Sequence, residues 1–375
     1  MAKPIGVYIH IPFCRKRCAY CDFYSAVIHK DMVSRYIKQL KNEIYRWGGQ
    51  LCRPADTVYF GGGTPSVLSA EELCDLLYCV KEAFGISSNA EITVEINPEG
   101  IDERFLSTLK KGGFNRLSIG IQSLDDNTLS LLGRGHSANE AVNTFTQARK
   151  VGFDNISVDL MCALPSEKTD SAIDSAKKII TLSPEHISCY MLILEDKTVF
   201  SAKKEQLSFP DEEAVEDEYL MLSQLFCENG YTHYEISNFS KEGKQSRHNT
   251  KYWKSQEYIG IGPSAYSFVD GQRFHYENDL KGFMGGTKTV SDGQGGDLIE
   301  YLMLSLRLSD GISEESIKEK FGKKFSKAFY EKARIFEKQK LAKFSDGHFG
   351  LTANGMLLSN AIICEMTEEE LYEDL

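Results

Sequence analysis

The chain has 375 residues, of which 42% are hydrophobic and 26% are charged, and its formal net charge is −11. This composition is that of a globular protein and excludes a disordered chain, a collagen-like fibre and a coiled coil. The acidic balance disfavours general nucleic-acid binding, because that affinity depends mainly on neutralising phosphates. The length suggests two or three domains, or one large barrel with an appendage.

Neither a signal peptide nor an integral membrane span is expected. Met1-Ala2-Lys3-Pro4 leads directly into a strand-like segment, and no apolar run approaches the roughly 18–20 residues that cross a bilayer. We therefore expect a cytoplasmic protein. Its ten cysteines are then expected to be thiols or metal ligands rather than disulfides.

Strand and helix signals alternate over the first half of the chain. Short β-rich runs predict strands at Gly6–Ile11, Thr57–Phe60, Glu91–Ile96, Arg116–Ile121, Asn155–Leu160 and His186–Leu192. Amphipathic stretches between them predict helices at Met32–Arg46, Ala70–Phe84, Asp102–Lys111, Ala138–Val151 and Ser171–Thr181. The strands are mostly apolar on both faces, as in a covered parallel sheet. Six such units predict an α/β fold, a partial (β/α)6 barrel of the triosephosphate isomerase (TIM) type.

The second half of the chain reads as separate parts. A helix is expected over about Asp211–Asn229, then an aromatic and polar region at Tyr231–Tyr276 and a Gly-rich linker at Gly282–Gly296. The sequence after this linker predicts helices near Leu298–Leu306, Glu314–Phe321 and Phe325–Gln339, a hairpin at Lys343–Leu351 and a short helix at Ala353–Ile362. This order predicts a small C-terminal α+β winged-helix-like domain. The predicted domains are 1–235 for the barrel, 236–290, and 291–375.

Three cysteines after the first predicted strand give the strongest chemical signal. Cys14, Cys18 and Cys21 lie within eight residues, so their thiolates can converge on one small electrophilic group. Structural zinc sites normally take four protein ligands, whereas three thiolates on a four-iron cluster leave one iron open for chemistry. The cations of Arg15–Arg17 favour thiolates and an anionic cluster. The alternatives are a zinc knuckle with His10 as fourth ligand, or three unrelated buried thiols.

Several further residues suit a ligand site at the carboxyl ends of the strands. The run Gly61-Gly62-Gly63-Thr64-Pro65 offers bare backbone groups for close approach, but lacks the end of a phosphate-binding loop. Polar side chains that interrupt or end apolar strands are costly to bury without a partner, and Arg134 is a loop cation that suits a carboxylate. The polar strand residues are Glu95, Gln122 and Asp159. For each of them a structural ion pair or hydrogen bond is the alternative.

The cysteine segment resembles the CxxxCxxC signature of radical S-adenosylmethionine proteins. The longer strings Tyr8–Cys14 and Cys18–Phe23 resemble the branch that contains the oxygen-independent coproporphyrinogen III oxidases and the HemW heme chaperones. The resemblance implies a [4Fe–4S] cluster on the three cysteines. It also implies an open iron that chelates the amino and carboxylate groups of S-adenosylmethionine. The S-adenosylmethionine contacts that it implies are Tyr8, Tyr20, Gly62, Gly63, Thr64, Glu95, Gln122, Arg134, Asp159 and Ile193. After Asp159 the chain departs from the family pattern, because Ala163 and Ser166 stand where relatives have glycine.

Three features separate the two family branches. The oxidases have a fourth cysteine where this chain has Phe23, and they have an extension before the first strand, which here begins within ten residues of Met1. The string His248-Asn249-Thr250-Lys251-Tyr252-Trp253 matches the HNxxYW motif of the chaperones. Imidazole can ligate heme iron, and aromatic rings offer flat apolar faces to a porphyrin. We therefore expect His248, Asn249, Tyr252 and Trp253 to bind heme; a buried histidine beside an aromatic pair is the alternative.

The sequence thus predicts a heme chaperone that binds heme, a [4Fe–4S] cluster and S-adenosylmethionine and delivers heme to an acceptor protein. An electron donor is implied if radical chemistry occurs, and cleavage of S-adenosylmethionine stays open. The first alternative is an oxygen-independent coproporphyrinogen III dehydrogenase. The second is a zinc-binding interaction protein that uses the terminal domain.

Overall fold

The computed structural model describes residues 3–165 and 169–375. Its centre is a curved twelve-stranded sheet of order β14-β13-β12-β11-β1-β4-β5-β6-β7-β8-β10-β9. The six central strands are parallel: β1 (Ile5–Ile11), β4 (Ala55–Gly62), β5 (Ile86–Ile96), β6 (Arg116–Gln122), β7 (Ile156–Cys162) and β8 (His186–Met191). These strands confirm the predicted partial barrel.

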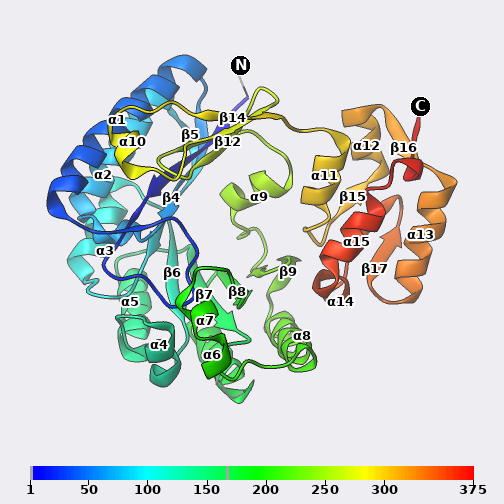
Figure 1. Ribbon diagram of the computed structural model, residues 1–375, viewed down its shortest axis with the longest axis horizontal. Coiled ribbons are helices and arrows are strands. Elements are labelled where there is room, and N and C mark those ends of the chain that lie inside the picture. Colours follow the sequence, from blue (N-terminus) through cyan, green and yellow to red (C-terminus); the bar gives the residue numbers. More distant parts are fainter. Residues whose placement is uncertain (1–2, 166–168) are drawn as a thin grey trace.

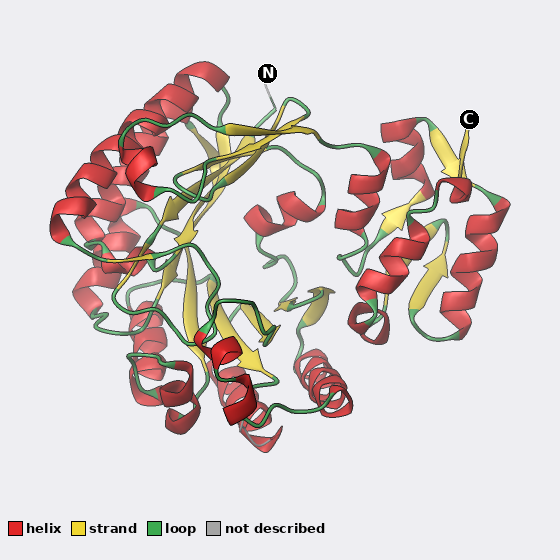
Figure 2. Cartoon of the chain, in the orientation of Figure 1, coloured by secondary structure: helices red, strands yellow, loops and turns green. Residues whose placement is uncertain are grey.

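Helices cover the outer face of this sheet (Figures 1 and 2). They are α1 (Lys30–Leu51), α2 (Ala70–Phe84), α3 (Glu103–Gly112), α4 (Asp126–Leu132), α5 (Ala138–Lys150) and α6 (Thr169–Leu182). Local sequence sets where they begin: Ser69 and Ser137 form capping boxes with Glu72 and Glu140 at the starts of α2 and α5. The helices and the outward side chains of the strands share one large apolar core.

The inward side chains of the central strands are polar, although the sequence analysis expects both faces to be apolar. On β6 and β7 the apolar Ile119 and Val158 belong to the core, whereas Ser118 and Asp159 share a hydrogen bond. The strands therefore alternate between apolar and polar positions, as expected when one face of a sheet lines a ligand cavity.

Additional strands extend the sheet at both edges. On one side lie β11 (Tyr258–Ile261), β12 (Tyr266–Val269), β13 (Gln272–His275) and β14 (Val290–Gln294), and on the other β10 (Asn238–Ser240) and β9 (Thr232–Glu235). The stretch Gly282–Gly296, predicted as a linker, contains α10 (Leu280–Met284) and β14, which pairs with β13. Other short elements are β2 (Phe13–Cys14), β3 (Ala26–Val27), α7 (Val199–Ala202), α8 (Glu212–Glu228) and α9 (Arg247–Trp253), with 3-10 turns at Pro65–Val67 and Lys204–Gln206.

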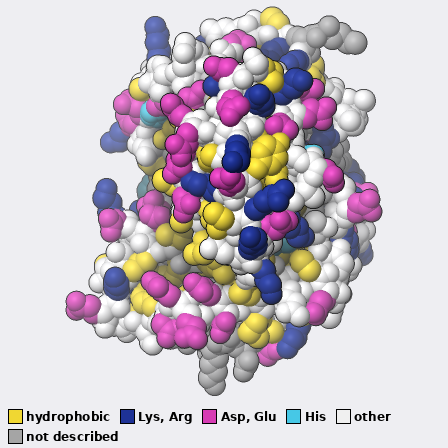
Figure 3. All heavy atoms as spheres, turned by 90° about the vertical axis from the view of Figure 1, so that its right-hand side faces the viewer, with side chains coloured by type: hydrophobic (Ala, Val, Ile, Leu, Met, Phe, Trp, Pro, Cys, Tyr) yellow, Lys and Arg dark blue, Asp and Glu magenta, His cyan; other side chains and the backbone are white. Residues whose placement is uncertain are grey.

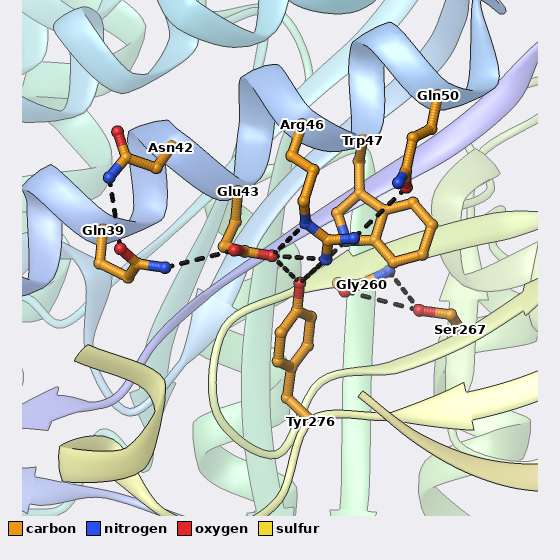
Figure 4. Close-up of polar contacts among 9 residues, drawn as sticks. All are labelled: Gln39, Asn42, Glu43, Arg46, Trp47, Gln50, Gly260, Ser267 and Tyr276. Carbon is orange, nitrogen blue, oxygen red and sulfur yellow. Dashed lines mark hydrogen bonds and ion pairs between the residues drawn. The ribbon is translucent and has the colours of Figure 1, made fainter. Parts of the chain in front are cut away.

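A polar cluster fastens the added strands to α1 (Figure 4). The hydroxyl of Tyr276, just after β13, accepts hydrogen bonds from Arg46 at 3.0 Å and from the Trp47 indole at 2.8 Å, and it donates to Glu43. The Trp47 ring also stacks on Phe274 of β13, with 5.3 Å between ring centroids. These buried polar groups satisfy each other, so the segment after α9 is anchored to the barrel.

The C-terminal unit has its own core and shares part of it with α8. Its elements are α11 (Leu298–Ser305), β15 (Ile312–Ser313), α12 (Glu314–Phe321), β16 (Lys323–Phe325), α13 (Lys327–Lys338), β17 (Ala342–Ser345), β18 (His348–Leu351), α14 (Ala353–Leu357), α15 (Ser359–Met366) and β19 (Tyr372–Asp374), with a 3-10 turn at Glu369–Leu371. The predicted helices and hairpin are present, and Tyr219 of α8 packs in the same core. On this side of the molecule, charges of both signs are interspersed (Figure 3).

Candidate functional site

One cavity of about 600 Å³ lies inside the curve of the sheet, at the carboxyl ends of the central strands. Its lining includes twelve of the residues singled out from the sequence for the cluster and its cosubstrate: Cys14, Cys18, Cys21, Tyr20, Gly62, Gly63, Thr64, Glu95, Gln122, Arg134, Asp159 and Ile193. The parallel topology explains this, because the carboxyl ends of such strands meet at one edge. Segments far apart in the sequence therefore share a single site.

The three cysteines are free thiols that face this cavity from the loop after β1. The Cys14 sulfur lies 3.4 Å from the Thr64 hydroxyl, and Arg134 approaches the Cys18 sulfur at 3.7 Å. Within the described ranges, no group of three or more His, Cys, Asp or Glu side chains is placed to hold a single metal ion. A four-iron cluster takes each thiolate on a different iron, so it does not require three ligands on one metal ion.

The ring of His10 is hydrogen-bonded to groups other than the cysteines, which bears on the zinc-knuckle alternative. Its ring nitrogens lie 3.1 Å from the Tyr8 hydroxyl and 3.3 Å from the Tyr24 carbonyl oxygen. Burial lowers the pKa of His10 to about 4, so the ring is a neutral structural group. The three cysteines therefore lack His10 as a fourth ligand in this conformation.

The glycine run at the end of β4 brings backbone close to the cysteine loop. Gly62 has φ +115°, and a Cβ on it would lie 2.7 Å from the His10 ring. A Cβ on Gly63 would lie 2.8 Å from the Phe13 carbonyl oxygen and 3.1 Å from the Cys14 sulfur. A larger residue at Gly62 would therefore collide with His10 of β1, and one at Gly63 would enter the space of the cysteine loop. These glycines fit the predicted role of close backbone approach to a ligand.

Two carboxyl groups lie deeper on the cavity wall. Glu95 accepts a hydrogen bond from the Tyr59 hydroxyl at 2.9 Å, and Asp159 accepts one from Ser118 at 3.2 Å. Burial, and then the charge of Asp159, raise the pKa of Glu95 to about 8, while burial raises that of Asp159. Glu95 is therefore mostly protonated at neutral pH and can donate a hydrogen bond to a ligand.

Arg134 joins the cysteine loop to the strand ends. Its guanidinium donates to the Asn97 side chain at 2.9 Å and to the Gly120 carbonyl at 2.8 Å. Gln122 ends β6 with φ +68°, which turns the chain at the cavity. Ala163 also has a positive φ, of 57°; Ser166 lies outside the described residues.

Four predicted residues do not line the cavity, namely Tyr8, His248, Tyr252 and Trp253. Tyr8 packs below it, against Tyr59 and the His248 ring, with centroid separations of 6.2 Å and 6.3 Å. His248 is fully buried, and its ring nitrogens lie 2.8 Å from both the Thr57 and the Tyr252 hydroxyls. Trp253 packs toward the C-terminal unit, under the Arg307 guanidinium at 5.6 Å.

Of the HNxxYW motif, Asn249 alone lies on the cavity wall in the described structure. The predicted heme contacts of this motif stay predictions.

The sequence analysis missed other groups on the cavity wall. Tyr59, Arg116, Ser118, His186, Ser188 and Tyr190 all line the cavity. Each of these side chains points to the inner face of the sheet, which receives every second side chain of a strand. The polar alternation along the strands was the available signal.

Comparisons with known proteins agree with this architecture. The model of the Radical SAM superfamily matches residues 8–179, and that of the HemN C-terminal domain matches residues 297–358. The heme chaperone HemW of Lactococcus lactis is 32% identical, with 100% of this chain and 99% of that protein covered. The chain belongs to the HemW family. The Bacillus subtilis family member is 34% identical over 95% of this chain and 97% of its own length.

A solved structure supports the family fold. Coproporphyrinogen III oxidase (HemN) of Escherichia coli, described as a radical SAM enzyme, superposes with a TM-score of 0.83 at 22% identity. The match covers 98% of this chain and 91% of that one. At this identity the likeness establishes the fold, including its C-terminal unit. No helix in the described residues is long and apolar enough to cross a membrane.

Proposed function

We propose that this protein is a heme chaperone, which binds heme and passes it to a heme-requiring acceptor. The observation that carries the proposal is the cysteine triad on one cavity, in a chain whose full-length relatives are named heme chaperone HemW. Phe23, which lines the cavity and is 71% exposed, stands where the resemblance places the fourth cysteine of the oxidases. We place the protein in the cytoplasm, whose reducing conditions preserve free thiols.

Cys14, Cys18 and Cys21 would hold the [4Fe–4S] cluster, and the strand-end residues would bind S-adenosylmethionine. The cluster would supply single electrons at the cysteine end of the cavity. The backbone at Gly62 and Gly63 would approach the ligand closely, Glu95 would donate or accept a hydrogen bond, and Arg134 would offset negative charge beside Cys18. Serine at any one of the three cysteine positions is expected to reduce the brown absorbance near 400 nm after anaerobic reconstitution.

For heme, we propose the segment His248–Trp253 with Asn249 as its point of contact with the cavity. Ligation of iron by His248 would require its ring to leave Thr57 and Tyr252, because both nitrogens have partners at 2.8 Å. Heme that enters the cavity can meet Asn249 without that change. The proposal therefore separates heme contact at Asn249 from iron ligation at His248.

The second candidate function is coproporphyrinogen III dehydrogenation, which the fold match to that oxidase favours. The test is anaerobic incubation of the reconstituted protein with coproporphyrinogen III, S-adenosylmethionine and dithionite. We expect no protoporphyrinogen, whereas its formation over many turnovers would overturn the chaperone proposal. Quantifying 5′-deoxyadenosine in the same samples, with and without heme, reports whether the cosubstrate is cleaved.

Heme delivery has its own test, because binding alone does not make a chaperone. Heme-loaded protein is mixed with a heme-free acceptor, and the transfer is followed by the change in the Soret band. The proposal predicts faster loading of the acceptor than spontaneous release from the carrier allows. An electron donor is implied only if the cosubstrate is cleaved.

A further inference from the structure

Arg116 is a buried cation at the inner end of the cavity. It begins β6, 1% of its surface is exposed, and its side chain lies on the cavity wall. The strand register places it beside Thr93 of β5, and Thr93 is beside Tyr59 of β4. Arg116 therefore belongs to the inward, polar side of the sheet.

The guanidinium of Arg116 makes no hydrogen bond and no ion pair with any of the described residues. Its Nε atom is buried without a hydrogen bond, as is the neighbouring Thr93 hydroxyl. A buried, unpaired charge is strongly unfavourable in a protein interior. A buried donor without a hydrogen bond on a cavity wall therefore marks a candidate position for ligand binding.

The neighbouring carboxyl groups are hydrogen-bonded to other side chains and not to Arg116. Glu95 is hydrogen-bonded to Tyr59, and Asp159 is hydrogen-bonded to Ser118. Both carboxyl groups interact with Arg116 electrostatically, yet burial keeps their pKa values raised, that of Glu95 to about 8. Glu95 is thus mostly protonated at pH 7, and the guanidinium of Arg116 keeps unused hydrogen-bond donors on the cavity wall.

We propose that the inner end of the cavity is a second ligand subsite, in which Arg116 binds a propionate carboxylate of the porphyrin. This inference rests on the proposed heme-chaperone function. The planar guanidinium matches a carboxylate in a two-point hydrogen bond. Tyr190, which lines the same cavity and is 41% exposed, offers apolar surface to the ring, and a cavity of about 600 Å³ is in the range of small-molecule sites.

The carboxylate of S-adenosylmethionine is a less suitable ligand for Arg116. That group belongs beside the cysteines, where Arg134 approaches Cys18 and donates to the Gly120 carbonyl. Gly120 stands four residues beyond Arg116 on β6, which is about 13 Å along a strand. The two arginines therefore serve opposite ends of the cavity.

The test compares hemin with hemin dimethyl ester, which lacks free carboxylates. Both are titrated anaerobically into wild-type protein and into Arg116→Met, and the Soret band is recorded. Wild type is expected to bind hemin about tenfold or more tightly than the ester, the value of one charged hydrogen bond. Arg116→Met should lose this preference while its affinity for the ester is unchanged.

Arg53→Met is the matched control, because Arg53 is a largely buried arginine that is paired with Glu257 at 2.6 Å. It should keep the preference for hemin. In ligand-free protein, Arg116→Met should raise the melting temperature by removing an unpaired charge, whereas Arg53→Met should lower it. A lower melting temperature for Arg116→Met would show a structural counter-ion and overturn the subsite.

The remaining outcomes separate the subsite from the proposed function. Equal wild-type affinity for hemin and its ester, or an unchanged preference in Arg116→Met, overturns the subsite and leaves the chaperone function standing. If Arg116→Met binds S-adenosylmethionine more weakly and hemin unchanged, Arg116 binds the carboxylate of that cosubstrate, and the porphyrin subsite is also overturned. If wild type binds neither porphyrin saturably, the proposed function fails together with the subsite.

Discussion

At the scale of single residues, the cavity is built from side chains that are costly to bury. Glu95 shows this clearly, because burial raises its pKa from 4.5 to about 8 despite the hydrogen bond from Tyr59. Between pH 4.5 and about 8, Glu95 is therefore mostly protonated in the native state and mostly ionised in the unfolded chain. Such a carboxyl group is prepared for a ligand at the expense of stability.

The titration of Glu95 gives a prediction for the ligand-free protein. Because the native pKa is the higher one, Glu95 lowers stability as pH rises from 4.5 to 8, by about 1.4 kcal/mol for each pH unit. Glu95→Gln cannot titrate, so the stability of this variant relative to wild type should increase as the pH rises across that range. Melting temperatures of both proteins at a series of pH values check this; parallel curves would show that Glu95 titrates normally.

At the scale of elements, α9 is a structural part of the barrel. Glu91 of β5 accepts hydrogen bonds from the backbone N–H groups of Arg247 and His248 at 3.2 Å and 3.1 Å. Lys251 forms a buried ion pair with Asp56 of β4 at 2.9 Å. The helix lies between the sheet and the C-terminal unit (Figure 1). It therefore links the two parts of the molecule.

The buried histidine of α9 gives a stability prediction. His248→Ala should lower the free energy of unfolding by about 2–4 kcal/mol, because it leaves a cavity and two hydroxyls without their partner. Tyr252→Phe, which removes a single hydrogen bond and keeps the ring, should cost about 1 kcal/mol. Urea unfolding measures both changes. If the free energy of unfolding is unchanged in His248→Ala, the ring is not held by these hydrogen bonds, and His248 is again an accessible candidate ligand for heme iron.

At the scale of the whole molecule, the C-terminal unit and the barrel are tied together. Tyr219 of α8 packs in the C-terminal core, and Ser309 donates a backbone hydrogen bond to the Tyr234 carbonyl at 3.0 Å. The Ser305 hydroxyl also donates to the Trp253 carbonyl of α9 at 3.3 Å. An interface that shares apolar core couples the stability of its two sides.

This coupling predicts a single unfolding transition. The two tryptophans report on different places, because Trp47 lies on α1 and Trp253 lies at the interface. Trp47→Phe and Trp253→Phe each leave one reporter, and each variant's fluorescence midpoint in urea should coincide with its far-ultraviolet dichroism midpoint. An earlier fluorescence transition in the variant that retains Trp253 would mean that the C-terminal unit separates before the barrel unfolds.

Much of this architecture is readable from the sequence, because local signals mark it. The six parallel strands lie close to their predicted bounds, and the C-terminal helices and hairpin are present where the pattern indicates them. The edge strands β11–β14 were missed, since β11 pairs with β1 across about two thirds of the chain and the Gly-rich composition around β14 is typical of a linker. Long-range pairing leaves little local trace.

The candidate site was predictable in part for the same reason. The cysteine spacing and the strand-end side chains identify the cavity, because parallel topology brings strand ends together. The burial of His248 was not predictable, since its partner Thr57 is 191 residues away. Arg116 was missed because it begins an apolar strand, and its lack of a partner is visible only in three dimensions.

The most direct test of the central claim is an anaerobic hemin titration of the cluster-reconstituted protein, followed by the Soret band. The account predicts saturable binding of one hemin per chain, in a protein that forms no protoporphyrinogen from coproporphyrinogen III. Absence of saturable hemin binding, together with turnover of coproporphyrinogen III, would contradict the chaperone assignment and make the protein an enzyme of the oxidase branch.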